Sequence, residues 1–376
     1  MESLTQPPPV FAFSRRIRKT PYEKRVMEQA PKSMTIYNST PLMTVFRSPQ
    51  EDYEHLCEHV QIWDVSCERQ AEIAGDDALR LVELITPRDI SKCKIGQCMY
   101  APLVDENGGI VNDPVLLRLG KQRFWLSTAD SDVLLWVKGI AYGIGYYTSI
   151  QDPDVSPLAI QGPRADDLMA DLLGEEIRQL PFFRFVRESL AGTSFYISRS
   201  GWSGQGGFEI YLEEYRKGLD LWDCIWEAGQ KYNIRAGCPN SIDRVERGLL
   251  SYGNDMTLNE NPYECGLDRF ISEDKKAECM SSVALKEIRD RGITHKLVYL
   301  LIQGEPLTTP REACTVNDES GVARGCLTSI AHSIRFGGNI AVATVETQFS
   351  IPGQRLFIEM GSDKLLKATV MSKLKE

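Results

Sequence analysis

Hydrophobic positions along the first 285 residues alternate between helical and extended patterns. The segment Ser48–Ile62 opens with a Ser, a Pro and two acids, and its apolar residues recur at helical spacing, which predicts a helix. Short β-rich runs such as Gln70–Ile73 and Gly207–Leu212 predict strands, whereas Lys217–Tyr232 predicts another helix. Helices and strands mixed along the chain in this way indicate an α+β fold.

The alternation restarts near Val155, where a predicted strand runs into Gln161-Gly162-Pro163 and a predicted helix follows. This repeated order predicts two similarly built α+β units. Beyond about residue 285 the chain consists of short β runs split by Gly and Pro, which predicts a small all-β domain at the C-terminus. The first forty residues, with three consecutive prolines and a basic run, are expected to form an extended arm that docks onto the body.

The composition is that of an ordinary folded protein with two or three domains. The chain has 376 residues, of which 42% are apolar and 25% are charged. Its net charge of −9 gives no general attraction to phosphate backbones or anionic lipids, so neither nucleic acid nor membrane is an expected partner. The ten cysteines include no C-x-x-C pair, and no basic segment precedes the first apolar residues. We therefore expect a cytoplasmic protein with reduced thiols.

Two histidines one helical turn apart, His55 and His59, together with Glu58 match the H-x-x-E-H metal-binding pattern. The chain has two other histidines, His295 and His332, and both fall in the predicted C-terminal domain. A third ligand is therefore not evident, so two partly exposed helix histidines are the better interpretation and no metal site is expected. The chain also lacks a G-x-S-x-G nucleophile elbow, so serine-hydrolase chemistry has little support.

A glycine-rich segment, Gly201–Gly207, precedes the predicted strand Phe208–Tyr211. Its glycines lie between two strands and not between a strand and a helix, so the segment is not a dinucleotide-binding fingerprint. A plain hairpin would explain the segment. However, Trp202 lies in the turn, and Glu209 and Tyr211 point to one face of the strand because side chains alternate with a period of two. This arrangement predicts the wall of a polar and aromatic pocket.

Charged residues at two further positions have both a structural and a functional interpretation. Asp113 opens an apolar strand, where a lone acid is either a turn cap or a member of a site. Arg244 and Glu246 lie in a predicted helix that ends at a Tyr-Gly-Asn-Asp turn, and solvated charge pairs would explain them equally well. None of these residues alone indicates a particular chemistry.

Six blocks of sequence follow one another in a fixed order. They are Trp63–Ser66, Gly109–Asp113, Ala159–Pro163, Arg199–Glu209, Arg244–Asp255 and Pro262–Leu267. In this order they resemble the glycine cleavage T-protein family of folate-dependent methyltransferases and aminomethyltransferases. Further blocks, Glu51–Ser66, Ala129–Asp132 and Gly237–Asn240, are similar to the branch of that family that demethylates dimethylsulfoniopropionate. At Cys67-Glu68-Arg69 the chain departs from the His-Met that T-proteins tend to have, and the signature of the tRNA-maintenance branch does not occur.

The resemblance implies a three-domain cloverleaf with tetrahydrofolate in a central channel. Two ferredoxin-like α+β domains are expected to be assembled from separate segments, a first, folate-binding one from residues 1–48 with 145–240 and a second from 49–144 with 241–285. Residues 286–376 are expected to form a C-terminal β-barrel domain. A homodimer is expected by analogy alone.

The resemblance also implies the transfer of a methyl group from the sulfonium of dimethylsulfoniopropionate to N5 of tetrahydrofolate. The products would be methylmercaptopropionate and 5-methyltetrahydrofolate, and no metal or redox cofactor is required. Positioning matters more than acid catalysis, because the sulfonium leaves as a neutral sulfide. The alternatives are a betaine, a methylamine or an aminomethyl carrier as donor, or a folate-binding protein without catalytic activity.

The expected site residues are carried over from matching positions of the family. Tyr100, Trp202 and Tyr211 are expected to hold the cationic sulfur against their aromatic faces. Glu209 would accept hydrogen bonds from the pterin edge, and Asp113 would lie near N5 to orient it or to accept a proton. The complete expected sets are, for the cofactor, Tyr100, Asp113, Glu209 and Arg244 and, for catalysis, Asp113 and Tyr211.

Overall fold

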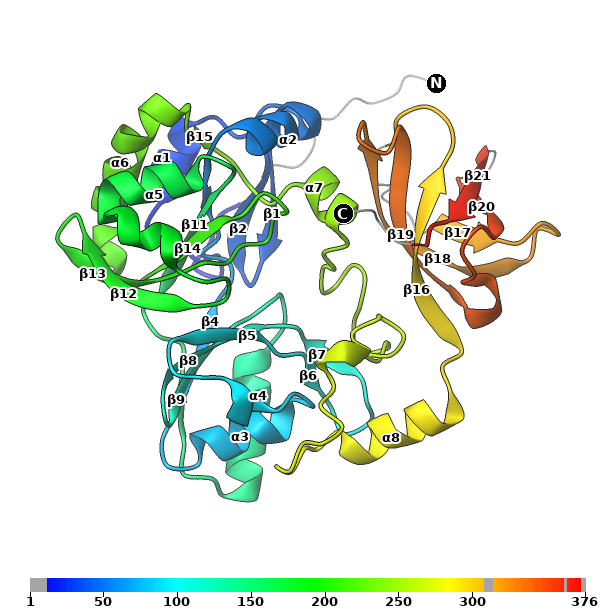
Figure 1. Cartoon of the computed structure of the whole chain (residues 1–376). Coiled ribbons are helices and arrows are strands. Elements are labelled where there is room, and N and C mark those ends of the chain that lie inside the picture. Colours follow the sequence, from blue (N-terminus) through cyan, green and yellow to red (C-terminus); the bar gives the residue numbers. More distant parts are fainter. Residues whose placement is uncertain (1–11, 308–313, 362–363, 373–376) are drawn as a thin grey trace.

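The chain folds into three lobes that meet near the centre of the molecule (Figure 1). The computed structural model describes residues 12–307, 314–361 and 364–372. Two lobes combine a sheet with helices, and the third is a closed barrel. The predicted fold class, two α+β units followed by a C-terminal β-barrel, is confirmed.

The first lobe is built on a six-stranded sheet with the strand order β12-β13-β14-β11-β3-β15. Helices α5 and α6 pack on this sheet, and Leu168 and Trp222 from them join the core with Phe195 and Phe208. Its strands are β3 (Gln61–Asp64), β11 (Ser156–Gln161), β12 (Phe185–Leu190), β13 (Thr193–Ser198), β14 (Gly207–Leu212) and β15 (Arg235–Ala236). The other elements of this lobe are α1 (Glu23–Glu28), α2 (Pro49–Glu58), α5 (Ala165–Leu173), α6 (Gly218–Gly229) and the hairpin of β1 (Ser33–Tyr37) and β2 (Thr40–Val45).

The second lobe is built on a five-stranded antiparallel sheet with the strand order β10-β4-β9-β8-β5. Helices α3 and α4 bury Leu81 and Val137 against it, beside Phe124 from the sheet. Its elements are β4 (Gln70–Ala74), α3 (Ala78–Ile85), β5 (Gln97–Tyr100), β6 (Leu103–Val104), β7 (Ile110–Asn112), β8 (Val115–Gly120), β9 (Arg123–Ser127), α4 (Val133–Ile144) and β10 (Ser149–Gln151).

The third lobe is a barrel closed in the order β16-β19-β18-β17-β20-β21. Helix α7 packs against it, because Ile242 and Val245 share a buried cluster with Ala331 and Val342 of the barrel. The elements from α7 onward are α7 (Ser241–Arg247), α8 (Ser282–Arg291), β16 (His295–Ile302), β17 (Cys314–Asn317), β18 (Ala323–Ser333), β19 (Gly338–Glu346), β20 (Arg355–Met360) and β21 (Lys364–Val370). In the described segments no helix is long and apolar enough to cross a membrane.

Helix α2 begins as the sequence predicts but ends earlier. The Ser48 hydroxyl accepts a hydrogen bond from Glu51 N at 3.1 Å, and Pro49 occupies the first turn. The helix stops at Glu58, short of the predicted Ile62, because the following residues pair with β11 as strand β3. Sheet pairing therefore overrides the helical pattern at this end.

The predicted domain limits place β3 in the second domain and β10 in the first, whereas the observed sheets contain them the other way round. Strand β3 lies within residues 49–144, yet it pairs with β11 in the first sheet. Strand β10 follows residue 145, yet it pairs with β4 in the second sheet. The expected extended arm also differs, since it contains helix α1, and Tyr22 and Val26 are buried in the core of the first lobe. The prolines at 7–9 lie outside the described residues.

The two sheets contact each other where β5 lies next to the start of β12. Cys98 N donates to Phe183 O at 2.8 Å, and Gln97 forms a bridge with Arg184. Behind these bonds a small buried cluster includes Cys98, Trp125 and Tyr211. This contact brings β14 of the first sheet and β5 of the second to the same region.

Candidate active site

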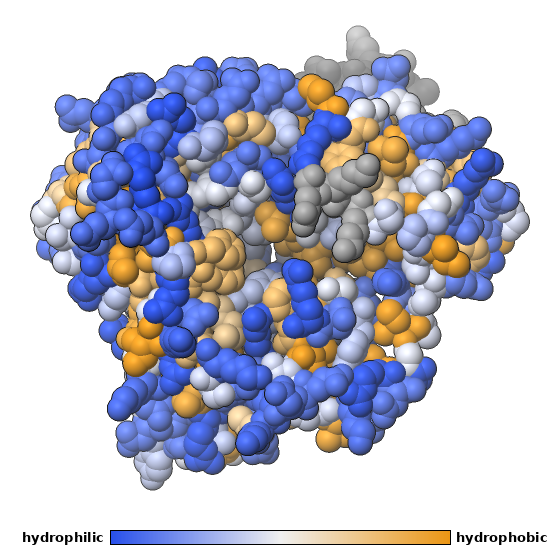
Figure 2. Space-filling model, in the orientation of Figure 1, coloured by the Kyte–Doolittle hydropathy of each residue, from blue (hydrophilic) through white to orange (hydrophobic). Residues whose placement is uncertain are grey.

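The connection from β3 to β4 leads from the first sheet to the second, and it carries Glu68. Glu209 on β14 and Asp113 after β7 lie close enough to Glu68 for the charges of both carboxyls to raise its pKa. We call Glu68, Asp113 and Glu209 the central acidic cluster. Figure 2 shows a hollow where the three lobes meet.

Glu209 and Tyr211 lie on the same face of β14, as predicted. The Tyr211 hydroxyl donates to Glu209 Oε2 at 3.3 Å, and the Ser200 hydroxyl donates to the same oxygen. Burial raises the pKa of Glu209, although the two hydroxyl hydrogen bonds oppose this rise. Glu209 Oε1 has no hydrogen-bond partner within the described part of the chain, so this buried carboxyl keeps an acceptor free.

Asp113 lies in the short connection between β7 and β8, next to Asn112, whose side chain is held by hydrogen bonds. The Asn112 side chain accepts from Ala129 N at 3.0 Å and donates to Ser131 Oγ at 2.8 Å. The Tyr100 hydroxyl donates to Asp113 Oδ2 at 3.0 Å. Burial raises the pKa of Asp113 to about 7, although the hydrogen bond from Tyr100 opposes this rise. Asp113 can therefore exchange a proton near neutral pH.

Glu68 belongs to the acidic cluster although the sequence did not single it out as a site residue. Its carboxylate accepts a hydrogen bond from Ser127 Oγ at 3.4 Å. Burial raises the pKa of Glu68 to about 8, and the nearby charges of Glu209 and Asp113 add to this rise. The sequence offers one signal for this residue, the departure from the T-protein pattern at Cys67-Glu68-Arg69.

Trp202 lies in the loop that joins β13 to β14, which confirms the predicted hairpin. The guanidinium of Arg244 lies over its ring, 5.8 Å from the centroid. Arg244 is itself buried, and it donates to Asp255 at 2.7 Å and to Ser329 Oγ at 2.5 Å. Arg244 is therefore held by protein groups and supports Trp202, and a direct contact with a cofactor stays a prediction.

The predicted site residues form three contacting pairs. Tyr100 hydrogen-bonds Asp113, Tyr211 hydrogen-bonds Glu209, and the guanidinium of Arg244 lies over the ring of Trp202. Over the described residues, no two rings among Tyr100, Trp202 and Tyr211 are in ring contact. Tyr100 lies 4.7 Å from Phe270 between ring centroids. Tyr211 is 1% exposed and lies 6.3 Å from Trp125. An aromatic cage formed by all three side chains therefore stays a prediction.

Glu68 and Asp113 combine partial exposure with a raised pKa. Surrounding protein must therefore desolvate both carboxyls while leaving them accessible, which is typical of residues that line a cleft. A cation bound between them would favour the ionised form of each carboxyl in the cluster and would lower their pKa values. The arrangement is suited to a small cationic ligand.

The two histidines of the H-x-x-E-H pattern interact mainly with the protein itself. His55 is buried, and not partly exposed as expected, with Nε2 at 2.8 Å from Asn233 O. Burial lowers the pKa of His55 to about 4. Its ring lies 4.9 Å from that of His59. Within residues 12–307, 314–361 and 364–372, no group of three His, Cys, Asp or Glu side chains is placed to hold a metal ion.

Two family models match most of the chain. The GCVT N-terminal domain matches residues 24–275, and the glycine cleavage T-protein C-terminal barrel domain matches residues 295–374. A dimethylsulfoniopropionate demethylase of Ruegeria pomeroyi is 46% identical over 346 residues, which cover 92% of this chain and 94% of that protein. An aminomethyltransferase of Bacillus cereus is 26% identical over 333 residues, which cover 87% of this chain and 89% of that protein.

A solved structure shares the arrangement of all three lobes. The glycine cleavage system aminomethyltransferase T from Bartonella henselae superposes with a TM-score of 0.84 and 24% sequence identity. The match covers 95% of this chain and 97% of that one, so the cloverleaf fold extends over both proteins. The two family models and the 46% identical relative agree with this similarity of fold. The chain therefore belongs to the glycine cleavage T-protein family of enzymes.

Proposed function

We propose that the protein is a tetrahydrofolate-dependent methyltransferase that demethylates dimethylsulfoniopropionate. The reaction would yield methylmercaptopropionate and 5-methyltetrahydrofolate. The observation that carries this proposal is the central acidic cluster, in which three desolvated carboxyls lie close together beside tyrosine side chains. A permanent cation such as a sulfonium suits this cluster, because it has no proton to lose and stabilises the carboxylates by its charge. The 46% identity to the Ruegeria pomeroyi enzyme supports the same substrate.

Glu209 is the residue best suited to hold the pterin of tetrahydrofolate. Its Oε1 is free of hydrogen bonds to the described residues, and its Oε2 is fixed by Ser200 and Tyr211. The two lone pairs of the free Oε1 can accept N–H donors of an aminopyrimidine ring. Tetrahydrofolate would supply N5, the atom that accepts the methyl group. The role of Arg244 would be to keep Trp202 in place beside this pterin.

Asp113 is the proposed proton acceptor. When N5 gains a methyl group and the sulfide leaves, one proton must be lost from the nitrogen. The carboxyl of Asp113, with its pKa near 7, can take up this proton at neutral pH. The Tyr100 hydrogen bond orients Asp113 Oδ2 for this role.

Tyr100, Trp202 and Tyr211 are the proposed aromatic contacts of the sulfonium. Each contact of a cation with a ring face contributes on the order of 0.5–2 kcal/mol. Such faces prefer the charged substrate to the neutral thioether product, which favours product release. Tyr211, hydrogen-bonded to Glu209, would also link donor and pterin during transfer.

The experiment that tests the function is a product analysis with several methyl donors. The purified protein is incubated with tetrahydrofolate and, separately, with dimethylsulfoniopropionate, glycine betaine, a methylamine or an aminomethyl-loaded lipoyl carrier, and the products are identified by mass spectrometry. We expect methylmercaptopropionate and 5-methyltetrahydrofolate from the first donor only. Turnover confined to another donor would replace the substrate and keep the folate site. Absence of product with saturating tetrahydrofolate and all donors would contradict a catalytic function.

Compartment and assembly belong to the same proposal. All ten cysteines are free thiols in the structure, which is the usual state in a reducing cytoplasm. We expect the protein to act there on a small molecule, and to assemble as a homodimer. Size-exclusion chromatography with light scattering measures the assembly directly.

A further inference from the structure

Phe270 lies under two guanidinium groups at the edge of the candidate site. The carbon of the Arg88 guanidinium is 4.8 Å from the ring centroid, and that of Arg269 is 4.7 Å from it. Arg269 and Phe270 belong to one short 3-10 turn, Asp268–Phe270, whereas Arg88 follows α3 in the second lobe. Two segments far apart in sequence thus bring two cations to the same ring.

Neither guanidinium has a carboxylate partner among the residues that the structure describes. Arg88 donates one hydrogen bond, from Nη1 to Tyr100 O at 2.9 Å. Burial lowers the pKa of Arg88, and the like charge of Arg269 lowers it further. An arginine carries five N–H donors, so both side chains keep donors that the described protein does not use. An anion that binds both guanidinium groups would relieve the repulsion between their like charges.

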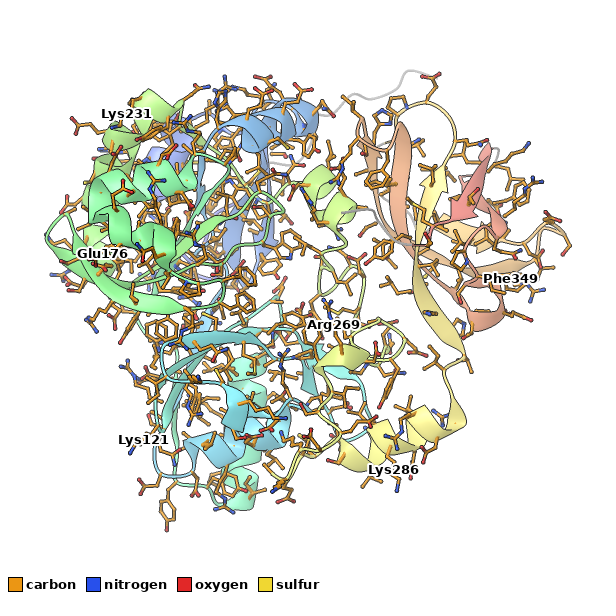
Figure 3. All side chains as sticks on the ribbon, viewed as in Figure 1. Lys121, Glu176, Lys231, Arg269, Lys286 and Phe349 are labelled. Atoms are coloured by element: carbon orange, nitrogen blue, oxygen red, sulfur yellow. The ribbon has the colours of Figure 1, made fainter. Side chains whose placement is uncertain are left out.

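Arg269 faces the region where the second lobe and the barrel meet. Its charge is close enough to lower the pKa of Tyr100 on β5 and the pKa of Tyr299 on β16. Arg269 is also exposed to solvent. In Figure 3 its label lies between the lobes, near the centre of the molecule. The Tyr100 ring contacts Phe270, so this pair of cations is one ring away from the residue that hydrogen-bonds Asp113.

We propose that Arg269 and Arg88, mounted on Phe270, form a carboxylate-binding subsite of the active site. The inference rests on the proposed function and adds the binding group for the anionic end of a ligand. A guanidinium presents paired N–H donors that match the two oxygens of a carboxylate. The central acidic cluster and this subsite then give the site opposite charges at its two ends.

Two ligands of the proposed reaction carry a carboxylate. The methyl donor is a zwitterion whose carboxylate lies two carbons from the sulfonium, and tetrahydrofolate ends in a glutamyl group. A zwitterion held at both charges has a defined orientation of its methyl group, and folate held at its glutamyl end has a defined position of N5. The chemistry of the subsite is the same in both cases, and the test separates them.

The test replaces Arg269 and varies the carboxylate of each ligand. Kinetics are measured for wild type, Arg269→Gln and Arg269→Lys with the donor acid or its uncharged amide, and with tetrahydrofolate or tetrahydropteroate, which lacks the glutamyl group. If the donor carboxylate binds here, Arg269→Gln raises KM for the acid roughly 10- to 100-fold and leaves KM for the amide unchanged. If the folate carboxylate binds here, the same rise is seen with tetrahydrofolate and not with tetrahydropteroate. Arg269→Lys should recover part of the affinity in either case.

The matched control is Arg289→Gln. Arg289 is an arginine of the nearby helix α8 whose charge is already paired with Glu273 at 3.0 Å. We expect this variant to leave all four KM values unchanged. Equal effects of Arg269→Gln on acid and amide, together with equal effects on the two folates, would overturn the subsite. A variant that merely unfolds would alter both members of each pair alike, and circular dichroism of each variant identifies it.

Calorimetry separates the subsite from the proposed reaction. Titration of the wild type and of Arg269→Gln with 5-formyltetrahydrofolate, with the corresponding pteroate and with each donor needs no turnover. If no sulfonium is demethylated but Arg269→Gln weakens only the carboxylate-bearing ligands, the proposed reaction fails and the subsite stands. If demethylation occurs but no ligand depends on Arg269 through its carboxylate, the subsite is wrong and the reaction stands.

Discussion

At the scale of single residues, the candidate site is defined by carboxyls whose protons are held more tightly than usual. Glu68, Asp113 and Glu209 all have a raised pKa, and burial is the largest cause for each. Buried carboxyls of this kind destabilise the folded state when they ionise. The protein without a bound ligand therefore has a lower free energy of unfolding than it would have without these carboxyls. A bound cation offsets that cost, which links ligand binding to pH.

Replacement of Glu68 by Gln is expected to stabilise the free protein at high pH. The pKa of Glu68 is about 8 in the folded protein against an ordinary 4.5, so the folded state keeps a proton that the unfolded state has lost. Stability therefore falls as the pH rises between about 4.5 and 8, and Gln does not titrate. Thermal unfolding should show a higher Tm for Glu68→Gln at pH 9 and a similar Tm near pH 4. Replacement of the exposed Glu58 by Gln is the control, and its Tm should follow the pH as that of the wild type does. A Tm of Glu68→Gln with the same pH dependence as the wild type would refute the prediction.

Replacement of Asp113 by Asn should remove the proton acceptor. We expect kcat to fall by about 10²–10⁴-fold, the usual contribution of general acid–base catalysis. In the wild type kcat/KM, which reports the free enzyme, should rise with pH through about 7 as Asp113 ionises, and the variant should lose this rise. The measurement is the pH profile of kcat/KM, taken with the donor well below saturation. Asp132→Asn, at an exposed helix start without a side-chain cap bond, should keep the wild-type profile.

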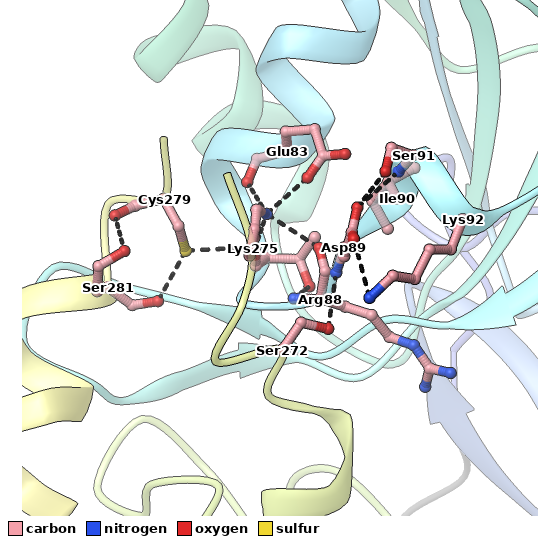
Figure 4. A network of polar contacts seen from close by, with 12 residues as sticks. Glu83, Arg88, Asp89, Ile90, Ser91, Lys92, Ser272, Lys275, Cys279 and Ser281 are labelled. Carbon is pink, nitrogen blue, oxygen red and sulfur yellow. Dashed lines mark hydrogen bonds and ion pairs between the residues drawn. The ribbon is translucent and has the colours of Figure 1, made fainter. Parts of the chain in front are cut away.

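At the scale of elements, the segment after α7 returns to the second lobe, and a buried lysine is one of the residues that hold it there. Lys275 Nζ lies 2.7 Å from Glu83 Oε2 and also donates to the carbonyls of Glu83, Thr86 and Arg88 (Figure 4). Both side chains are 5% exposed. The bond to Arg88 O ties this segment to the backbone that carries Arg88, and Phe270 lies a few residues before Lys275 along the same segment.

Replacement of Lys275 by Met should lower the free energy of unfolding by about 3–5 kcal/mol, because Glu83 is left as an unpaired buried charge. The double variant Lys275→Met with Glu83→Leu should recover much of that loss, since it buries no charge. Urea denaturation of the single and double variants measures both values. Lys92→Gln, which removes two surface pairs, with Asp89 and with Asp274, should change stability by less than about 1 kcal/mol. Equal losses for the single and double variants would contradict this account.

At the scale of the whole molecule, α7 connects the first lobe to the barrel. Glu246 accepts hydrogen bonds from Tyr53 of α2 at 2.7 Å and from Ser333 of the barrel at 2.5 Å. Arg244 and Asp255 form a buried ion pair, with side chains 10% and 0% exposed, that also bonds Ser329 of the barrel. The same arginine supports Trp202, so the position of the barrel is coupled to the candidate site.

Replacement of Arg244 by Gln should affect stability and substrate binding together. Loss of the cation leaves Asp255 buried without its partner, which costs about 3–5 kcal/mol. Loss of its support under Trp202 should raise KM for the donor at temperatures where the variant is folded. Urea denaturation and steady-state kinetics measure the two effects. A stability within about 0.5 kcal/mol of the wild type would show that the ion pair does not hold the barrel.

The sequence by itself determined the family, the fold class and most elements. Helix α5 follows Gln161-Gly162-Pro163 as predicted and strand β14 occurs over the predicted residues, because local apolar spacing and Gly or Pro boundaries specify them. Local pattern failed where long-range pairing decided the outcome, as at the end of α2 and in the exchange of β3 and β10 between sheets. The alternation of side chains along a strand, by contrast, correctly predicted that Glu209 and Tyr211 lie on one face of β14.

Only the tertiary structure decided which side chains share the site. Glu68, Asp113 and Glu209 are far apart in sequence, and their common desolvation arises from the crossing of the chain between two sheets. The same holds for Arg88 and Arg269, whose unpaired charges meet on Phe270. Burial and charge proximity depend on atoms brought together from the whole chain, and no local pattern of residues carries that information.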